Sequence, residues 1–121
     1  MTFNSRTTAV QVSSTLETKE WADRVVFITG TTHGIGMETV RAFVSMKYSP
    51  TLVLANRNQE IAQASMEAFQ KEFPDHTLRF HLLQLDLSSL ESVVECARRF
   101  NELRLPLHVL LLNAGIFASK F

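Results

Sequence analysis

Apolar and polar residues follow two alternating patterns along most of the chain. Four short runs rich in β-branched and other apolar residues cover 24–30, 51–57, 77–86 and 106–115. A short apolar run bounded by turn residues is typical of a buried strand. Between these runs lie three segments in which apolar residues recur at helical spacing. The order β-α-β-α-β-α-β predicts an α/β fold with one parallel sheet and helices on both faces.

The first two helical segments have clear boundaries. We expect one helix over 35–47, because Pro50 prevents its continuation into the second strand. We expect another to begin after Asn58, which suits a helix N-cap, and to end at Pro74. Its apolar positions are separated by four, three and four residues: Ala62, Met66, Phe69 and Phe73. That spacing predicts one buried face.

The third helical segment follows Ser88 and Glu91, whose S-x-x-E spacing predicts a capping box. Its apolar residues are expected on one face of the helix: Leu90, Val93, Val94, Ala97 and Phe100. Cys96 lies beside this stripe, and we expect a buried, unreactive thiol there.

The overall composition excludes several classes of protein. The 121 residues suffice for one domain, and 12 basic residues balance 12 acidic ones. A net charge of zero argues against a nucleic-acid partner, which favours a basic surface. The single cysteine permits no internal disulfide and fits a reducing compartment. No apolar run is long enough for a transmembrane helix, so we expect a cytoplasmic protein.

The first 20 residues differ in character from the rest of the chain. They contain eight Ser or Thr residues and no Gly or Pro, and they lack the apolar core of a secretory signal. We therefore expect residues 1–20 to form a flexible N-terminal tail and residues 21–121 to form the folded part.

Residues 29–36, TGTTHGIG, connect the first strand to the first helix. A phosphate at a helix N-terminus approaches backbone N–H groups, so glycine is favoured where the chain bends and where the ligand comes close. The spacing is G-x-x-x-G-x-G rather than the G-x-G-x-x-G of the general dinucleotide motif. A tight strand-to-helix turn without a ligand is the alternative. The candidate ligand-binding residues are Gly30, Thr31, His33, Gly34, Ile35 and Gly36.

Asn56 and Arg57 end the second strand. In a dinucleotide-binding sheet an acid near this position bonds the 2′-hydroxyl of NAD, whereas an arginine accommodates the 2′-phosphate of NADP. Asn56 and Arg57 occupy the position at which an NAD-binding protein carries an acid. The positive charge of Arg57 therefore favours NADP(H) over NAD(H). A solvated loop arginine is the alternative. The lack of an acid also disfavours a Rossmann-like methyltransferase.

The third and fourth strands also end in candidate ligand-binding residues. Asp86 and Leu87 follow the third strand, where Asp86 either holds an adenine amino group or caps the next helix together with Ser88. Residues 113–115, Asn-Ala-Gly, follow the fourth, and a strand-end glycine lets a ligand approach the backbone. Because α/β sheets bind ligands at the carboxyl ends of their strands, all four segments point to one cleft.

Together these segments resemble the short-chain dehydrogenase/reductase family. Its motif T-G-x-x-x-G-I-G is matched by residues 29–36, its D-L by residues 86–87, and its N-A-G by Asn113, Ala114 and Gly115. The resemblance covers residues 21–117. Within the family, the A-x-R-N at 55–58 and the segment PLHVLLLNAGIF are similar to the branch of retinol dehydrogenases and WW-domain oxidoreductases.

The resemblance implies a fold, an activity and a set of residue roles. It implies a Rossmann-type parallel sheet with flanking helices, truncated to about four strands in the order 3-2-1-4, so that 21–121 is an NAD(P)-binding half-domain. It also implies an NADP(H)-dependent oxidoreductase that transfers hydride between alcohols and carbonyl compounds. The glycine turn would line the pyrophosphate and ribose, and Arg57 would contact the 2′-phosphate. Asp86 and Leu87 would flank the adenine, and residues 113–115 would border its ribose and support the sheet.

The catalytic residues of the family are a serine, a tyrosine and a lysine four residues after that tyrosine. The lysine is needed because a nearby cation lowers the phenol pKa from about 10 toward neutral pH. The single tyrosine here, Tyr48, is followed at that distance by Leu52. We therefore assign no catalytic residue and expect this chain alone to be inactive. A non-catalytic nucleotide-binding or interaction protein is the alternative.

The histidines do not form a recognisable site in the sequence. His33 occupies a variable position of the glycine turn and is expected to face solvent, while His76, His81 and His108 are scattered. They show neither the i, i+4 spacing nor the cysteine partners of a metal site, so none is predicted.

The fourth strand leads to a prediction about stability. In the family's sheet a further strand covers residues 107–113, LHVLLLN, which here form an exposed apolar edge. We therefore expect residues 1–121 alone to be marginally stable or to associate through this strand. Thermal unfolding followed by circular dichroism checks this expectation, and a sharp cooperative transition of the isolated monomer would contradict it.

Overall fold

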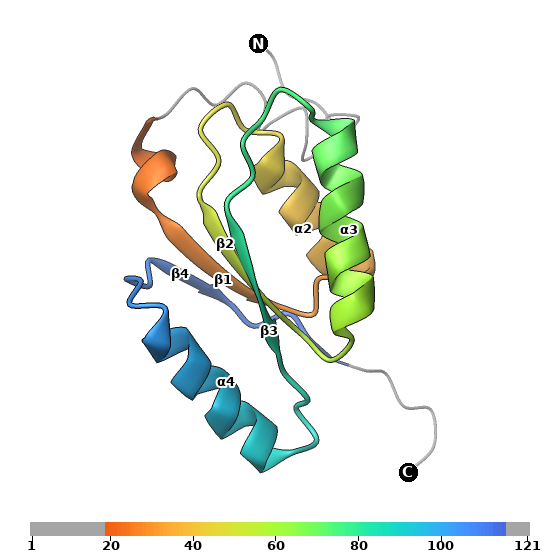
Figure 1. Ribbon diagram of the computed structural model, residues 1–121, viewed down its shortest axis with the longest axis vertical. Coiled ribbons are helices and arrows are strands. Elements are labelled where there is room, and N and C mark those ends of the chain that lie inside the picture. The colour runs from red at the N-terminus through yellow and green to blue at the C-terminus, as the bar shows by residue number, and fades with distance from the viewer. Residues whose placement is uncertain (1–18, 116–121) are drawn as a thin grey trace.

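The computed structural model describes residues 19–115, which contain one sheet of four strands in the order β3-β2-β1-β4 (Figure 1). The strands are β1 (Val25–Thr29), β2 (Thr51–Asn56), β3 (Phe80–Gln84) and β4 (Val109–Leu111). Every pairing between neighbours is parallel. The predicted α/β fold and strand order are confirmed.

Three α-helices of the described residues cover the two faces of this sheet. α2 (Gly34–Val44) and α3 (Gln59–Glu72) lie together on one face, and α4 (Leu90–Glu102) lies on the other (Figure 1). A short 3-10 helix, η1 (Lys19–Asp23), precedes β1. Residues 1–18 of the predicted tail lie outside the described residues.

The strands supply two hydrophobic layers, because successive side chains point to opposite faces of a sheet. The layer on the side of α2 and α3 includes Val26, Ile28, Leu52 and Leu54 of the strands, packed with Met66 and Phe69 of α3. The layer on the side of α4 includes Val25, Val53, Ala55, Leu83 and Leu85, packed with Cys96 of α4. Val26 and Ile28 are fully buried, and burying one such side chain contributes about 1.5–3 kcal/mol. The sheet is thus held by packing on both faces.

The second predicted helix is confirmed, while the first ends earlier than expected. Asn58 Oδ1 accepts the Ile61 N–H at 3.0 Å and caps α3. α2 ends at Val44, three residues before the predicted boundary at residue 47. A proline disfavours helical backbone at the residue before it, here Ser49 ahead of Pro50. Residues 45–50 therefore form the turn between α2 and β2.

The predicted capping box of α4 is wrong by one residue. Ser89, not Ser88, is the N-cap, and its hydroxyl accepts the Ser92 N–H at 3.2 Å. Ser88 instead donates its N–H and its hydroxyl to Asp86 Oδ1, at 3.0 and 2.6 Å. The Asp86 carboxylate therefore holds Ser88 in a local turn, and the next serine begins the helix.

Of the predicted apolar stripe on α4, only Phe100 is partly buried, and its ring meets the Phe27 ring edge-on at 5.3 Å. The buried side chain of this helix is Cys96, which lies beside the stripe. By contrast, Leu90 and Val94 are 79% and 61% exposed. Burial raises the pKa of the Cys96 thiol and keeps it protonated, as expected for a buried cysteine.

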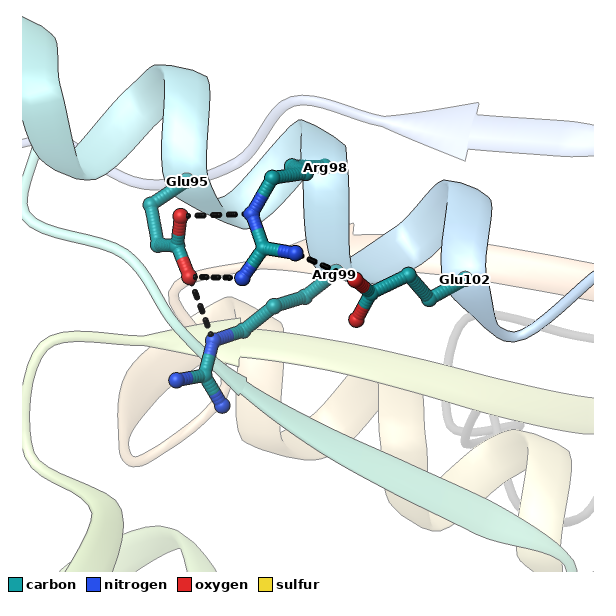
Figure 2. Close-up of polar contacts among 4 residues, drawn as sticks. All are labelled: Glu95, Arg98, Arg99 and Glu102. Carbon is teal, nitrogen blue, oxygen red and sulfur yellow. Dashed lines mark hydrogen bonds and ion pairs between the residues drawn. The ribbon is translucent and has the colours of Figure 1, made fainter.

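A network of ion pairs lies along the exposed surface of α4 (Figure 2). Arg98 donates from Nε and Nη2 to Glu95 at 2.8 and 2.6 Å and from Nη1 to Glu102. Arg99 Nε also donates to Glu95, at 3.0 Å. The bonds from Arg98 and then Arg99 lower the pKa of Glu95 to about 2. Because the pairs are three or four residues apart, they support the helix itself, and this support is lost only as the pH falls toward that value.

The edge strand β4 is joined to β1 by a side chain as well as by the backbone. The His108 N–H donates to the Val25 carbonyl at 3.1 Å. The Val25 N–H in turn donates to His108 Nδ1 at 2.9 Å. His108 therefore closes a reciprocal pair of bonds where β4 begins.

This pair yields a prediction about stability. His108→Ala removes the acceptor of the Val25 N–H and should lower the free energy of unfolding by about 1 kcal/mol. His108→Asn keeps an acceptor atom at nearly the same distance from the backbone and should recover most of that loss. Urea unfolding followed by circular dichroism measures both variants, and an Asn variant as unstable as the Ala variant would contradict the role of Nδ1.

Candidate cofactor-binding site

The glycine turn, residues 29–36, leaves the carboxyl end of β1 and enters α2. Gly30 and Gly34 have positive φ, +71° and +62°, which side-chain-bearing residues rarely adopt. At Gly36 the conformation is helical, but a Cβ would lie 1.9 Å from the Gly30 carbonyl oxygen. Glycine is therefore required for two different reasons. At Gly30 and Gly34 the backbone conformation requires it, and at Gly36 the close packing within the turn requires it.

The end of β4 holds one side of this turn. Thr29 Oγ1 accepts the N–H groups of Asn113 and Ala114 at 3.0 and 2.9 Å. Asn113 Nδ2 donates to the Gly30 carbonyl at 2.9 Å. A Cβ on Gly30 would lie 2.7 Å from the Ala114 Cα, so the two segments are in close contact. The structure thus brings the predicted residues 113 and 114 directly against the turn.

The end of β2 holds the other side. The Gly30 N–H donates to the Ala55 carbonyl at 3.0 Å. Asn56 Oδ1 accepts the Thr31 N–H at 2.6 Å, and Asn56 Nδ2 donates to Thr31 Oγ1 at 2.8 Å. Asn56 and Thr31 are both buried. The Asn56 side chain is therefore turned toward the glycine turn, with both of its polar atoms bonded there.

The N-terminus of α2 is open toward solvent. Its N-cap residue, His33, makes no side-chain capping bond, and its Nδ1 lies 3.0 Å from Thr32 Oγ1. A Cβ at Gly34 would meet no atom within 4 Å apart from its chain neighbours and its own helix backbone, and Ile35 is 79% exposed. The first turn of a helix carries N–H groups without intrahelical partners and a positive dipole end. These residues therefore fit an anionic group such as a pyrophosphate.

Arg57 follows β2, and Asp86 follows β3. Arg57 is exposed directly after β2. The bonds from Ser88 lower the pKa of Asp86, and the nearby charge of Arg57 lowers it further. Asp86 is thus an ionised acceptor near a cation, and Leu87 beside it is 58% exposed. The sequence left open whether Asp86 holds a ligand or caps the next helix together with Ser88. Its Oδ1 accepts both bonds from Ser88 and so orders the turn before α4, while a ligand role for the same carboxylate stays a prediction.

The tyrosine lies away from the glycine turn, and neither a metal site nor a membrane-spanning helix is found among residues 19–115. Tyr48 precedes β2 and so lies at the amino end of the parallel sheet, whereas the glycine turn lies at the carboxyl end. Within residues 19–115, no group of three or more His, Cys, Asp or Glu is placed to hold a metal ion. None of the helices in the same range is both long and apolar enough to cross a membrane.

A comparison of the sequence with models of known protein families identifies the family of this chain. The sequence model of the family described as short chain dehydrogenase matches residues 24–121. The chain belongs to this family. The resemblance to this family is therefore confirmed.

Individual relatives agree with this assignment. The WW domain-containing oxidoreductase of Gallus gallus is 31% identical over 119 residues, which make up 98% of this chain and 27% of that protein. The short-chain dehydrogenase TIC 32 A, chloroplastic, of Brassica napus is 34% identical over 119 residues, 98% of this chain and 35% of that protein. The chain thus spans about a third or less of the length of these relatives. The first of them belongs to the branch that the sequence resembles.

A solved structure confirms the Rossmann-type fold. The NADPH-bound carbonyl reductase from chicken fatty liver superposes with a TM-score of 0.65 at 24% sequence identity. The match covers 81% of this chain and 36% of that one. At this identity the likeness supports the arrangement of strands and helices.

The sequence did not reveal the role of Thr29, which appears there only as the first residue of the family motif. Its hydroxyl joins β1 to the end of β4. Ser88, expected to help cap the next helix, instead donates to Asp86 Oδ1. The position of Thr29 immediately before the first glycine was the available signal, because a strand-end hydroxyl often bonds neighbouring backbone.

The close packing at Gly36 yields a prediction. Gly36→Ala places a methyl group against the Gly30 carbonyl and Asn113 Nδ2, so the turn must separate from β4. We expect the free energy of unfolding to fall by about 1–3 kcal/mol. Gly115→Ala is the matched control, because a Cβ there meets no atom within 4 Å. Urea unfolding compares the two, and equal midpoints would contradict the described packing.

Proposed function

We propose that this chain is the cofactor-binding part of an oxidoreductase that takes NADP(H) in preference to NAD(H). The observation that carries the proposal is the pairing of an open helix N-terminus at Gly34 with an exposed arginine at the end of the next strand. The helix N-terminus suits the pyrophosphate that both dinucleotides share. Arg57 suits the 2′-phosphate that only NADP(H) carries.

The remaining residues would complete the dinucleotide site. Gly30, Thr31 and His33 would form the turn around the pyrophosphate together with Gly34, Ile35 and Gly36. Asp86 would accept a hydrogen bond from the adenine amino group, which its ionised state favours. Leu87 would contact the adenine face, and Asn113, Ala114 and Gly115 would border the adenine ribose. The two segments at 86–87 and 113–115 follow strands on either side of the turn.

When bound, the dinucleotide would donate hydride to a carbonyl compound in its reduced form or accept hydride from an alcohol in its oxidised form. The residues of this chain would bind and orient it, and we assign them no proton-transfer step. Tyr48 lies at the opposite end of the sheet, and Leu52 stands where a lysine would be needed. We therefore propose that the chain by itself binds NADP(H) without turnover.

A non-catalytic interaction protein is the second candidate, because the edge of the sheet carries exposed apolar side chains. Leu110 and Leu112 are 49% and 77% exposed on and beside β4, and Val94 of α4 is 61% exposed. Such a surface favours association with another strand or helix. The cytoplasmic location and the lack of a nucleic-acid partner stay predictions from composition.

Titration of the purified chain with NADPH, with a parallel assay of NADPH oxidation in the presence of simple ketones, tests the proposed function. Binding without turnover is expected. Absence of binding would contradict the cofactor role and favour the interaction role, and measurable turnover would contradict the proposal that no catalytic residue is present.

Cofactor preference yields a sharper prediction. Arg57→Asp should weaken NADPH binding by roughly 1.5–3 kcal/mol, because a charge-assisted contact is lost, and should change NADH binding far less. Arg24→Asp is the matched control, since it changes the charge equally at the exposed amino end of β1. Isothermal titration with both dinucleotides measures the difference. Equal losses for NADPH and NADH would refute the assignment of Arg57.

A further inference from the structure

Both polar atoms of the Asn56 side chain form hydrogen bonds with the glycine turn. Its Oδ1 accepts the Thr31 N–H at 2.6 Å, and its Nδ2 donates to Thr31 Oγ1 at 2.8 Å. A backbone N–H only donates, so Oδ1 must face it, and the amide orientation follows from this. Asn56 is 4% exposed and Thr31 is 3% exposed, so little water competes for either bond.

The backbone of Asn56 is itself firmly placed. It pairs with Gln84 in the register of β2 and β3, and its carbonyl accepts bonds from Leu85 N–H and Gln59 Nε2 at 2.9 and 3.0 Å. The side chain therefore projects from a strand that lies between two others. A short carboxamide held in this way has few alternative orientations.

The bond occurs where β1 and β2 separate. The Gly30 N–H still reaches the Ala55 carbonyl at 3.0 Å, which continues the pattern of the sheet. At the next residue, Thr31, the partner is the side chain of Asn56 rather than a strand carbonyl. Without it, a buried backbone N–H would have no partner, which is costly.

We propose that Asn56 is a positioning residue, which fixes the conformation of the glycine turn through Thr31 so that the turn receives the cofactor pyrophosphate without rearrangement. This inference rests on the proposed function. It assigns Asn56 a role distinct from that of its neighbour: the amide of Asn56 holds the turn, while the exposed Arg57 distinguishes the two dinucleotides. Preorganisation of this kind raises affinity because less ordering is needed on binding.

Four variants separate the contributions. Asn56→Ala removes both bonds, whereas Thr31→Val removes only the bond to the hydroxyl and keeps the Thr31 N–H. Thr31→Ser keeps both bonds and is the conservative variant. Asn101→Ala, at an exposed position of α4, is the control for loss of an asparagine elsewhere.

Amide hydrogen exchange measured by NMR tests the bond without any cofactor. In Asn56→Ala the Thr31 amide should exchange at least about tenfold faster, while the Ile28 amide within β1 keeps its rate. In Thr31→Val the amide of residue 31 should stay largely protected. An unchanged rate at Thr31 in Asn56→Ala would overturn the inference, because the bond would then not hold the turn.

Calorimetric titration tests the consequence for binding. Asn56→Ala should weaken NADPH and NADH by the same factor, about tenfold, because both carry the pyrophosphate. Thr31→Val should show a smaller loss, and Thr31→Ser should lose less than Thr31→Val because it keeps the hydroxyl. Asn101→Ala, away from the turn, should bind as the unaltered chain does. Titrations are made at a temperature well below the thermal unfolding midpoint of each variant. Each variant is then fully folded, so that a loss of stability alone leaves the measured affinity unchanged.

The outcomes are distinguishable from failure of the proposed function. If the unaltered chain binds neither dinucleotide, the proposed function fails and the positioning role fails with it, whatever the exchange rates show. If the unaltered chain binds and Asn56→Ala binds equally well, only the positioning role is overturned. A loss confined to NADPH would also overturn it, because Asn56 would then act on the 2′-phosphate rather than through the turn. Should Asn56→Ala fail to fold, a Thr31→Val variant that binds as tightly as Thr31→Ser overturns it.

Discussion

The close contact between the end of β1 and the end of β4 is the constraint on which the site depends. Thr29 Oγ1 accepts two backbone N–H groups from the β4 side, and Asn113 Nδ2 returns a bond to the Gly30 carbonyl. This geometry leaves no room for a Cβ at Gly30 or Gly36. The glycines therefore serve the packing of two strand ends as much as the approach of a ligand, and any side chain there would separate them.

The second tether, from Asn56, comes from the opposite side of the turn. Residues 29–31 are thus bonded to both neighbouring strands of β1, whereas residues 33–35 are exposed at the start of α2. A rigid first half and an open second half suit an anion site, because the N–H groups at the helix terminus are held in place by bonds the ligand does not have to form. Arg57, exposed directly after β2, adds a positive charge at the same end of the sheet.

The features that follow local rules were predictable from the sequence. The order of elements, the cap at Asn58 and the positive φ of Gly30 and Gly34 depend on residues a few positions apart. The position of Arg57 was also predictable, because it directly follows the apolar run that forms β2. The start of α4 was missed by one residue because two neighbouring serines suit the same role, and only the Asp86 carboxylate decides between them.

The sequence by itself determined the α/β alternation, the family and the set of residues at the carboxyl ends of the strands, because hydrophobic periodicity and turn chemistry act over short distances. Only the tertiary structure decided which of those residues form hydrogen bonds with one another. Asn56 and Thr31 are 25 positions apart, and Asn113 and Gly30 are 83 apart. Bonds over such separations exist only once the parallel strands have aligned, since the register of the sheet, and not any local preference, brings their polar atoms within reach.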